Sequence, residues 1–214
     1  MVCLIAYLLP DAQKIAKIHP QFHPPVKSRF IPLFLIQMAT LEVDQSGKWE
    51  SSSDTIIGIS GATLPFSVKV LHRTKNRVSA QLGLFEQEKG RSKKMKIVCM
   101  FTYTVFLAVC LAIRKGDRLL IDVEYDGSDD TIRDLLLYLF RRFSNLEMSS
   151  DQVVFGHVGK QSMSHIVAYQ TFTGRRRAER ELLFEDYFRL LDRTAEIRNK
   201  AFRKRMRARK DWPR

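Results

Sequence analysis

The sequence predicts an α/β fold in which a mixed sheet is flanked by helices. Segments rich in apolar and β-branched residues alternate with segments of helical periodicity, most clearly between residues 118 and 171. Such strand–helix–strand alternation is typical of a sheet whose faces are covered by helices. The length of 214 residues and the hydrophobic fraction of 45% suit one domain with a sizeable core, with or without extensions.

Two short strands open the predicted domain. Residues 40–44 end before a turn at 45–48, and residues 54–60 are rich in β-branched side chains. Residues 65–84 show no clean period and fit a strand and a helix equally. Residues 86–96 are strongly basic, and we interpret them as a mobile connection.

Residues 97–113 form an uncharged segment between basic flanks, with Lys96 before it and Arg114 after it. A membrane span needs about 20 apolar residues, so this segment is at the short limit. The α/β pattern on both sides favours a helix buried beneath a sheet and other helices. We therefore expect a buried helix and no membrane association, with a single membrane span as the alternative.

The second half predicts two strands and three helices. Residues 118–124 and 152–158 are apolar and predict strands. Between them a helix is predicted, capped at Ser128 or its neighbour. Its apolar residues recur at spacings of three and four: Ile132, Leu135, Leu136, Leu139, Phe140 and Phe143. Further helices are predicted at 163–171 and from residue 179 to about residue 210.

These patterns divide the chain into three parts. Residues 1–37 break at His-Pro motifs and connect to no later pattern, so we interpret them as an N-terminal extension, with an arm packed on the domain as the alternative. Residues 38–190 form the predicted domain, and residues 191–214 form a basic helical tail. The apolar run at the start lacks a preceding positive charge, which disfavours a signal peptide.

Charge predicts the class of partner. The formal net charge is +13, and an excess of this size favours nucleic acid as the partner over an anionic membrane surface. A solvated tail without a partner is the remaining alternative. The residues expected to contact phosphates are Arg175, Arg176, Arg177, Arg203, Lys204, Arg205, Arg207, Arg209 and Lys210.

Cysteine usage predicts the compartment. The chain has 3 cysteines and no C-x-x-C pair, so a disulfide framework or a zinc site is not expected. A reducing, cytoplasmic setting fits this pattern.

Carboxylates stand at the ends of two predicted strands. Asp44 ends the first strand, and Asp122 lies within the apolar strand at 118–124. Glu124 is two residues further on, so it shares a face with Asp122. A carboxylate in an apolar strand is costly unless it is paired or binds a metal. If the two strands are neighbours, these three acids predict a Mg²⁺ or Mn²⁺ site, whereas each acid alone fits a structural role.

The order of elements and the placement of the acids resemble the ribonuclease-H-like superfamily. The motifs that carry the resemblance are VDQSGK at 43–48, DTIIGIS at 54–60, IDVEY at 121–125 and VFGHVGKQSMSH at 154–165. In that superfamily the first strand carries an Asp, which Asp44 matches, and the strand after the first long helix carries a second acid, which Asp122 matches. The resemblance implies a ribonuclease-H-like mixed sheet over about residues 38–190, with a basic C-terminal helix after it.

The sequence also departs from that pattern. Ribonuclease H enzymes of the first type carry a Glu in the first long helix, but residues 97–113 contain no acid. Those of the second type have a Glu directly after the first Asp, where this chain has Gln45. Glu124 is the expected substitute. The superfamily's last acid comes from a C-terminal helix, where the candidates are Glu181, Glu185 and Asp186, and we expect Glu185 as the metal ligand.

Two further residues follow the strand at 152–158. Such enzymes often place a His or Lys there to move protons or to steady the scissile phosphate, which makes Lys160 and His165 candidate catalytic residues with Asp44, Asp122 and Glu124. A solvated turn lysine and a helix histidine without a catalytic role are the alternatives.

The resemblance therefore implies a Mg²⁺- or Mn²⁺-dependent nuclease that cleaves phosphodiester bonds, with no small-molecule cofactor. Asp44 is expected to bridge two metal ions. A nucleic-acid-binding module on the same fold, without catalysis, is the first alternative. A small membrane protein that spans at 97–113 is the second.

Overall fold

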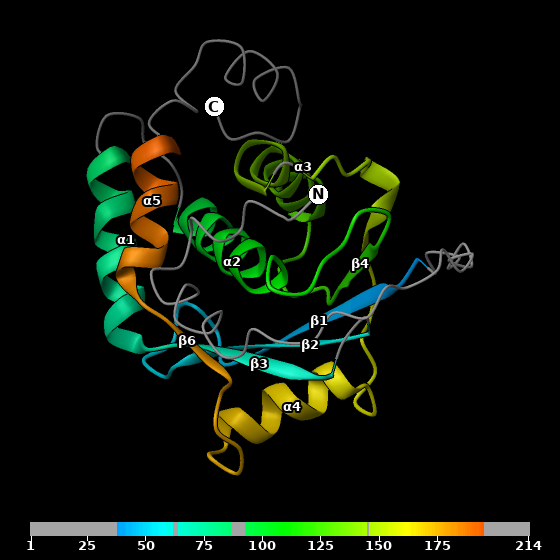
Figure 1. The fold of residues 1–214 in the computed structure, drawn as a ribbon. Coiled ribbons are helices and arrows are strands. Elements are labelled where there is room, and N and C mark those ends of the chain that lie inside the picture. The colour runs from blue at the N-terminus through cyan, green and yellow to red at the C-terminus, as the bar shows by residue number, and fades with distance from the viewer. Residues whose placement is uncertain (1–37, 62–63, 87–92, 145, 195–214) are drawn as a thin grey trace, which may run out of the picture. The chain divides into compact units, whose positions relative to one another are not determined.

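The computed structural model describes residues 38–61, 64–86, 93–144 and 146–194. These residues form an α/β structure with a six-stranded mixed sheet and helices on both faces (Figure 1). The N-terminal extension and the basic tail, including Arg203, Lys204, Arg205, Arg207, Arg209 and Lys210, lie outside the described residues.

The sheet has the strand order β5-β4-β1-β2-β3-β6. Neighbours run antiparallel in the pairs β1–β2 and β2–β3, and parallel in the pairs β1–β4, β4–β5 and β3–β6. The strands are β1 (Thr40–Ser46), β2 (Thr55–Ser60), β3 (Phe66–Val70), β4 (Arg118–Ile121), β5 (Val153–Phe155) and β6 (Arg180–Leu182).

Helices cover the two faces unequally. Of the helices that the structure describes, α4 alone lies on one face, against β1 and β2, whereas the other four lie on the opposite face (Figure 1). The helices are α1 (His72–Glu86), α2 (Lys93–Val109), α3 (Asp129–Leu139), α4 (Met163–Phe172) and α5 (Phe184–Thr194).

The hydrophobic core lies on the four-helix face and is centred on α2. Most α2 side chains from Met95 to Val109 are buried, which confirms the buried helix predicted for residues 97–113. The helix begins at Lys93, so the end of the segment interpreted as a connection is helical. Among the described residues, no helix is long and apolar enough to cross a membrane.

Residues 65–84, whose sequence fits a strand and a helix equally, contain one of each: the strand β3 and most of the helix α1. Val68 and Val70 are buried in β3, and Val78 and Leu82 are buried on α1. The chain switches from a period of two to a helical period at residue 71, so no single period fits the whole segment.

The predicted helix after Ser128 is α3, and its stripe from Ile132 to Phe140 is buried. Ser128 occupies the capping position, but its side chain makes no capping hydrogen bond. The helix continues into a π-helical turn at Phe140–Ser144. The two neighbouring strands are shorter than predicted: β4 ends at Ile121 and β5 at Phe155.

The prediction of one helix from residue 179 onward was wrong at its start. Arg180–Leu182 is the edge strand β6, which pairs in parallel with β3. Glu179 holds this crossing in place, because its Oε2 accepts hydrogen bonds from the Ser67 backbone N–H at 2.7 Å and from the Ser67 hydroxyl at 3.0 Å. The helix α5 begins only at Phe184.

Candidate metal centre

Asp44 lies on the side of β1 that faces α4. Its neighbours Leu41 and Val43 belong to the core. On the antiparallel strand β2 the residue paired with Asp44 is Gly58, which contributes no side chain. Asp44 is only 3% exposed, and its Oδ2 atom has no hydrogen-bond partner among the described residues. Burying a carboxylate oxygen without a hydrogen bond costs free energy, and a bound proton or cation would offset this cost.

Asp122 follows directly after β4, the parallel neighbour of β1. Its backbone N–H donates to the Val43 carbonyl at 2.9 Å, which extends the β1–β4 pairing by one residue. Its Oδ1 atom accepts from the Val158 N–H at 2.7 Å. The loop after β5 therefore fixes the orientation of this carboxylate.

Glu124 completes an acidic group, two residues beyond Asp122 and outside any strand. One carboxylate oxygen from each of Asp44, Asp122 and Glu124 lies within 4.8 Å of the others. We call these three residues the acidic centre. Oxygen ligands at such separations suit a hard divalent cation.

Burial and mutual repulsion raise the pKa of two of these acids. Loss of solvent raises the pKa of Asp44 to about 6; His165 opposes this shift and the charge of Asp122 adds to it. The pKa of Glu124 rises to about 7, first through burial and then through Asp122 and Asp44, while Lys48 opposes the shift. Both shifts mean that these two carboxylates hold a proton more readily than solvated carboxylates do.

His165 reaches the acidic centre from α4, the helix on that face of the sheet. Its Nδ1 atom lies 3.3 Å from Oδ2 of Asp44, a contact that lacks the geometry of a hydrogen bond. The start of α4 is anchored one turn earlier, where the Ser162 hydroxyl donates to Oε2 of Glu42 at 2.5 Å. Ser60 donates to the same oxygen at 3.2 Å. Glu42, on the same strand as Asp44, thus sets the position of His165.

A buried lysine supports the turn beside the acidic centre. Nζ of Lys75, on α1, donates to the carbonyls of Lys48 and Ser51 at 3.0 Å each and to the hydroxyl of Thr55 at 3.2 Å. Burial lowers the pKa of Lys75, although the three hydrogen bonds satisfy its ammonium group. The sequence did not predict the supporting roles of Glu42 and Lys75, because nothing in their local pattern distinguishes them from solvated charged residues.

The structure does not bring every candidate residue to this centre. Glu185, the expected last ligand, lies on α5, on the opposite face of the sheet, and forms an ion pair with Arg77 at 3.7 Å. The structure therefore does not bring Glu185 together with Asp44, Asp122 and Glu124, which form the acidic group in the described residues. Lys160 lies exposed in the turn before α4.

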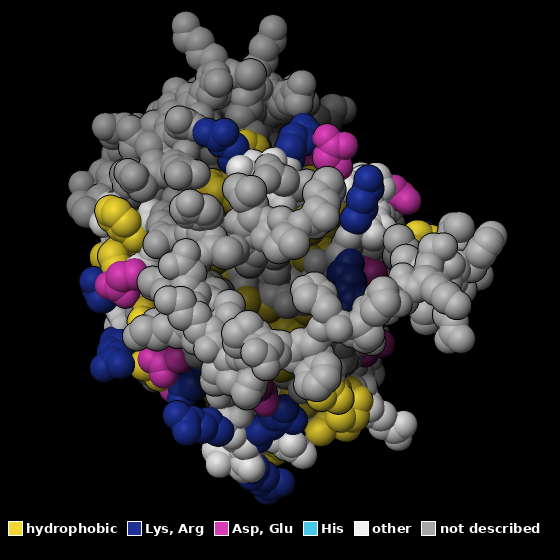
Figure 2. All heavy atoms as spheres, in the orientation of Figure 1, with side chains coloured by type: hydrophobic (Ala, Val, Ile, Leu, Met, Phe, Trp, Pro, Cys, Tyr) yellow, Lys and Arg dark blue, Asp and Glu magenta, His cyan; other side chains and the backbone are white. Residues whose placement is uncertain are grey.

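The arginines at 175–177 follow α4. Arg175 and Arg177 are exposed, and Arg176 pairs with Glu179. Lysine and arginine side chains gather around this end of α4 and the start of β6 (Figure 2). The groove there is lined by Lys69, Arg176, Arg177 and Arg180, but also by Glu179 and Glu181.

Comparison with known proteins adds no family assignment. No protein-family model matches the chain, and neither a curated protein sequence nor a solved structure matches it.

The raised pKa values predict how stability depends on pH when divalent ions are removed. The folded-state pKa of Asp44 is about 6 against an ordinary value of 3.8, so the folded protein holds this proton more tightly than the unfolded chain. A raised acid pKa stabilises the fold at low pH, and this contribution is lost as pH rises from about 4 to about 6. Urea unfolding in EDTA, compared between the wild type and Asp44→Asn, should therefore show the wild type losing stability relative to the variant across this window. A constant difference between the two proteins would contradict the shift.

Proposed function

We propose that this protein is a divalent-metal-dependent nuclease with a ribonuclease-H-like fold. The observation that carries the proposal is the acidic centre, in which three carboxylate oxygens lie within 4.8 Å of one another. The buried Oδ2 of Asp44 is a second observation in its favour: no described residue donates a hydrogen bond to it, His165 Nδ1 lies 3.3 Å away, and a cation would satisfy it.

The sheet topology supports the assignment of the fold. Asp44 lies on the first strand of the domain, and Asp122 follows the strand after the long helices, as the resemblance requires. The two strands are parallel neighbours. Glu124 takes the place of the acid that the resemblance puts on the first long helix or directly after the first Asp.

The residues present fit a hard cation, and their roles follow from their positions. Asp44, Asp122 and Glu124 would hold Mg²⁺ or Mn²⁺, which supplies Lewis-acid stabilisation to a phosphodiester. Val158 orients Asp122 through its backbone N–H. His165 can carry a proton at Nδ1 beside Asp44, which suits it to proton transfer at this edge of the acidic centre.

Cleavage by the purified full chain tests the proposal. The substrates are single-stranded DNA, single-stranded RNA, an RNA–DNA hybrid and a branched DNA junction, each with Mg²⁺, Mn²⁺ or EDTA. We expect cleavage of at least one substrate with Mg²⁺ or Mn²⁺ and none with EDTA. Binding without cleavage under every condition would instead support a non-catalytic nucleic-acid-binding protein on this fold.

A further inference from the structure

Three ring side chains lie along one flank of α4, the helix that covers the acidic centre's face of the sheet. His165, Tyr169 and Phe172 are spaced four and three residues apart, which places them one above another on a helix. Tyr169 is 48% exposed and Phe172 is 42% exposed. One exposed apolar residue is ordinary, but adjacent exposed rings form a surface suited to a partner. We call these three side chains the ring row.

Contacts at both ends hold the ring row in place. The rings of His165 and Tyr169 are nearly parallel, at 5°, with centroids 6.3 Å apart. The ring of Phe172 lies against Gly47, where an added Cβ would come within 2.7 Å of ring atom Cε2. Gly47 has a φ of +79°, so the same glycine allows both the turn and the ring contact. A surface ordered before binding loses less entropy when a ligand docks.

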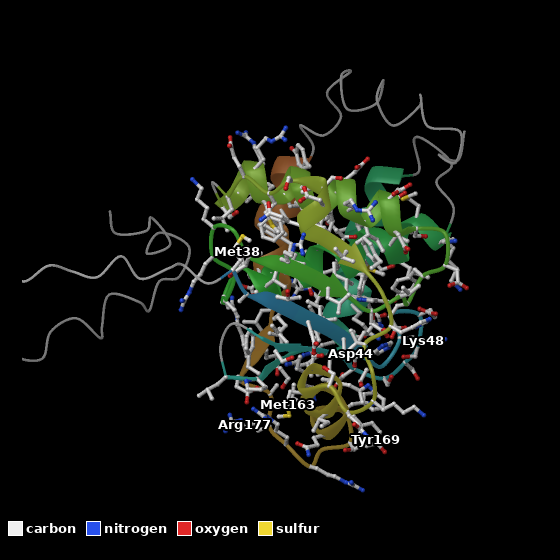
Figure 3. All side chains as sticks on the ribbon, turned by 90° about the vertical axis from the view of Figure 1, so that its right-hand side faces the viewer. Met38, Asp44, Lys48, Met163, Tyr169 and Arg177 are labelled. Carbon is white, nitrogen blue, oxygen red and sulfur yellow. The ribbon has the colours of Figure 1, made fainter. Side chains whose placement is uncertain are left out.

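The ring row runs from the acidic centre to the turn between β1 and β2. At one end, Nδ1 of His165 is 3.3 Å from Asp44. At the other end, Phe172 contacts Gly47. The next residue, Lys48, is exposed, and its positive charge lowers the pKa of Glu124. Figure 3 shows Lys48 and Tyr169 toward one side of α4 and Met163 and Arg177 toward the other, with Asp44 on the strand that α4 covers.

We propose that the ring row binds single-stranded nucleic acid, with bases stacked on Tyr169 and Phe172 and the backbone passing Lys48. The inference rests on the proposed function, because it makes the ring row the part of the nuclease that presents the strand to the acidic centre. Aromatic rings beside a cationic side chain match the chemistry of an unpaired strand. A duplex keeps its bases stacked inside, so it cannot use these rings.

Oligonucleotide binding by the full chain tests this assignment without requiring cleavage. The probes are fluorescently labelled single strands of DNA and RNA and a DNA duplex of the same sequence, titrated in Ca²⁺ and in EDTA and followed by anisotropy. Loss of one stacked base weakens binding by about 5- to 150-fold, so Tyr169→Ala and Phe172→Ala should each show a loss of this order on at least one single strand. Duplex affinity should stay within about twofold.

Two variants serve as controls. Phe188→Ala removes a ring that is equally exposed, at 48%, but lies on α5 and should change nothing. Tyr169→Trp keeps an aromatic face and should retain single-strand affinity. Equal affinities for Tyr169→Ala, Phe172→Ala and Phe188→Ala, equal losses on single strand and duplex, or no oligonucleotide binding by the wild type would each overturn the inference.

The outcomes for the ring row and for the nuclease can be told apart. Cleavage in Mg²⁺ or Mn²⁺ together with unchanged single-strand affinity of the ring variants would reject the ring row and keep the nuclease. Selective loss of single-strand affinity, without wild-type cleavage on any substrate, would keep the ring row as a binding surface and reject the nuclease.

Discussion

Asp44→Asn should abolish metal-dependent cleavage while nucleic-acid binding is retained. Asn keeps the shape of the side chain but removes the charge that would hold a cation in the acidic centre. Metal-ion stabilisation amounts to several kcal/mol, and about 1.4 kcal/mol corresponds to a factor of ten, so cleavage should fall by about a thousandfold or more. Initial cleavage rates in Mg²⁺ and in Mn²⁺, with anisotropy binding measured in parallel, check both parts.

Glu185→Gln is the matched control for Asp44→Asn. It also replaces one acid by its amide, but Glu185 pairs with Arg77 on the opposite face of the sheet. Cleavage should stay within about twofold of the wild type, because a surface ion pair contributes little to stability. Unchanged cleavage in Asp44→Asn, or an equal loss in both variants, would reject the acidic centre as the catalytic site.

The same substitution of Asp44 should stabilise the metal-free protein above about pH 6. Burial and the charge of Asp122 raise the pKa of Asp44, so ionised Asp44 destabilises the fold at neutral pH. An uncharged amide at this position would remove the repulsion. A fall in both stability and cleavage would point instead to misfolding of the variant, which the binding measurement would also show.

The strand-end acids could be predicted because their signals are local. Asp44 stands before a Gly turn, and Asp122 interrupts an apolar run, so each residue's own neighbours mark it as a carboxylate near the end of a strand. The predicted bound at residue 44 was two residues too early, because β1 continues to Ser46. The register Val43–Ile121 between β1 and β4 then brings the two together. Side chains two residues apart in a strand share a face, which predicted that Glu124 lies beside Asp122. Glu124 does lie in the acidic centre, although β4 ends at Ile121 and the residue is outside the strand.

Glu185 could not be placed from the sequence because its position depends on long-range pairing. The acids at 181–186 fit the start of a helix, which is all that a local pattern can express. Pairing of β6 with β3 carries the chain along the far edge of the sheet, and α5 then packs on α1 and α2. A local pattern does not reveal on which face of the sheet a helix lies.

The residues that surround the candidate site could not be predicted from local patterns either. Lys75 is buried because α1 places it under the turn at 48–51, and two of its three partners are backbone carbonyls that any sequence possesses. Tyr169 and Phe172 resemble core residues of a helix. They are exposed because α4 rests on the sheet through its small residues, Ser164 and Ala168, at Gly58.

This close approach makes Gly58 a position where a single methyl group should destabilise the fold. A Cβ at residue 58 would lie 2.1 Å from the Ser164 carbonyl oxygen and 2.9 Å from the Ala168 Cβ atom. Neither neighbour is the flexible end of a side chain, so α4 as a whole must move. Overpacking of this kind costs about 1–3 kcal/mol, and we expect Gly58→Ala to fall at the upper end.

Urea unfolding measures this cost, and Gly159→Ala is the control. A Cβ at Gly159 would meet nothing within 4 Å, and Gly159 does not have a positive φ. Gly159→Ala should therefore leave stability unchanged or raise it by about 0.4–1 kcal/mol through the unfolded chain. Because alanine is no worse than glycine within a strand, a loss confined to Gly58→Ala can come only from contact with α4. Equal unfolding midpoints for the two variants would mean that α4 does not rest on β2 at this distance.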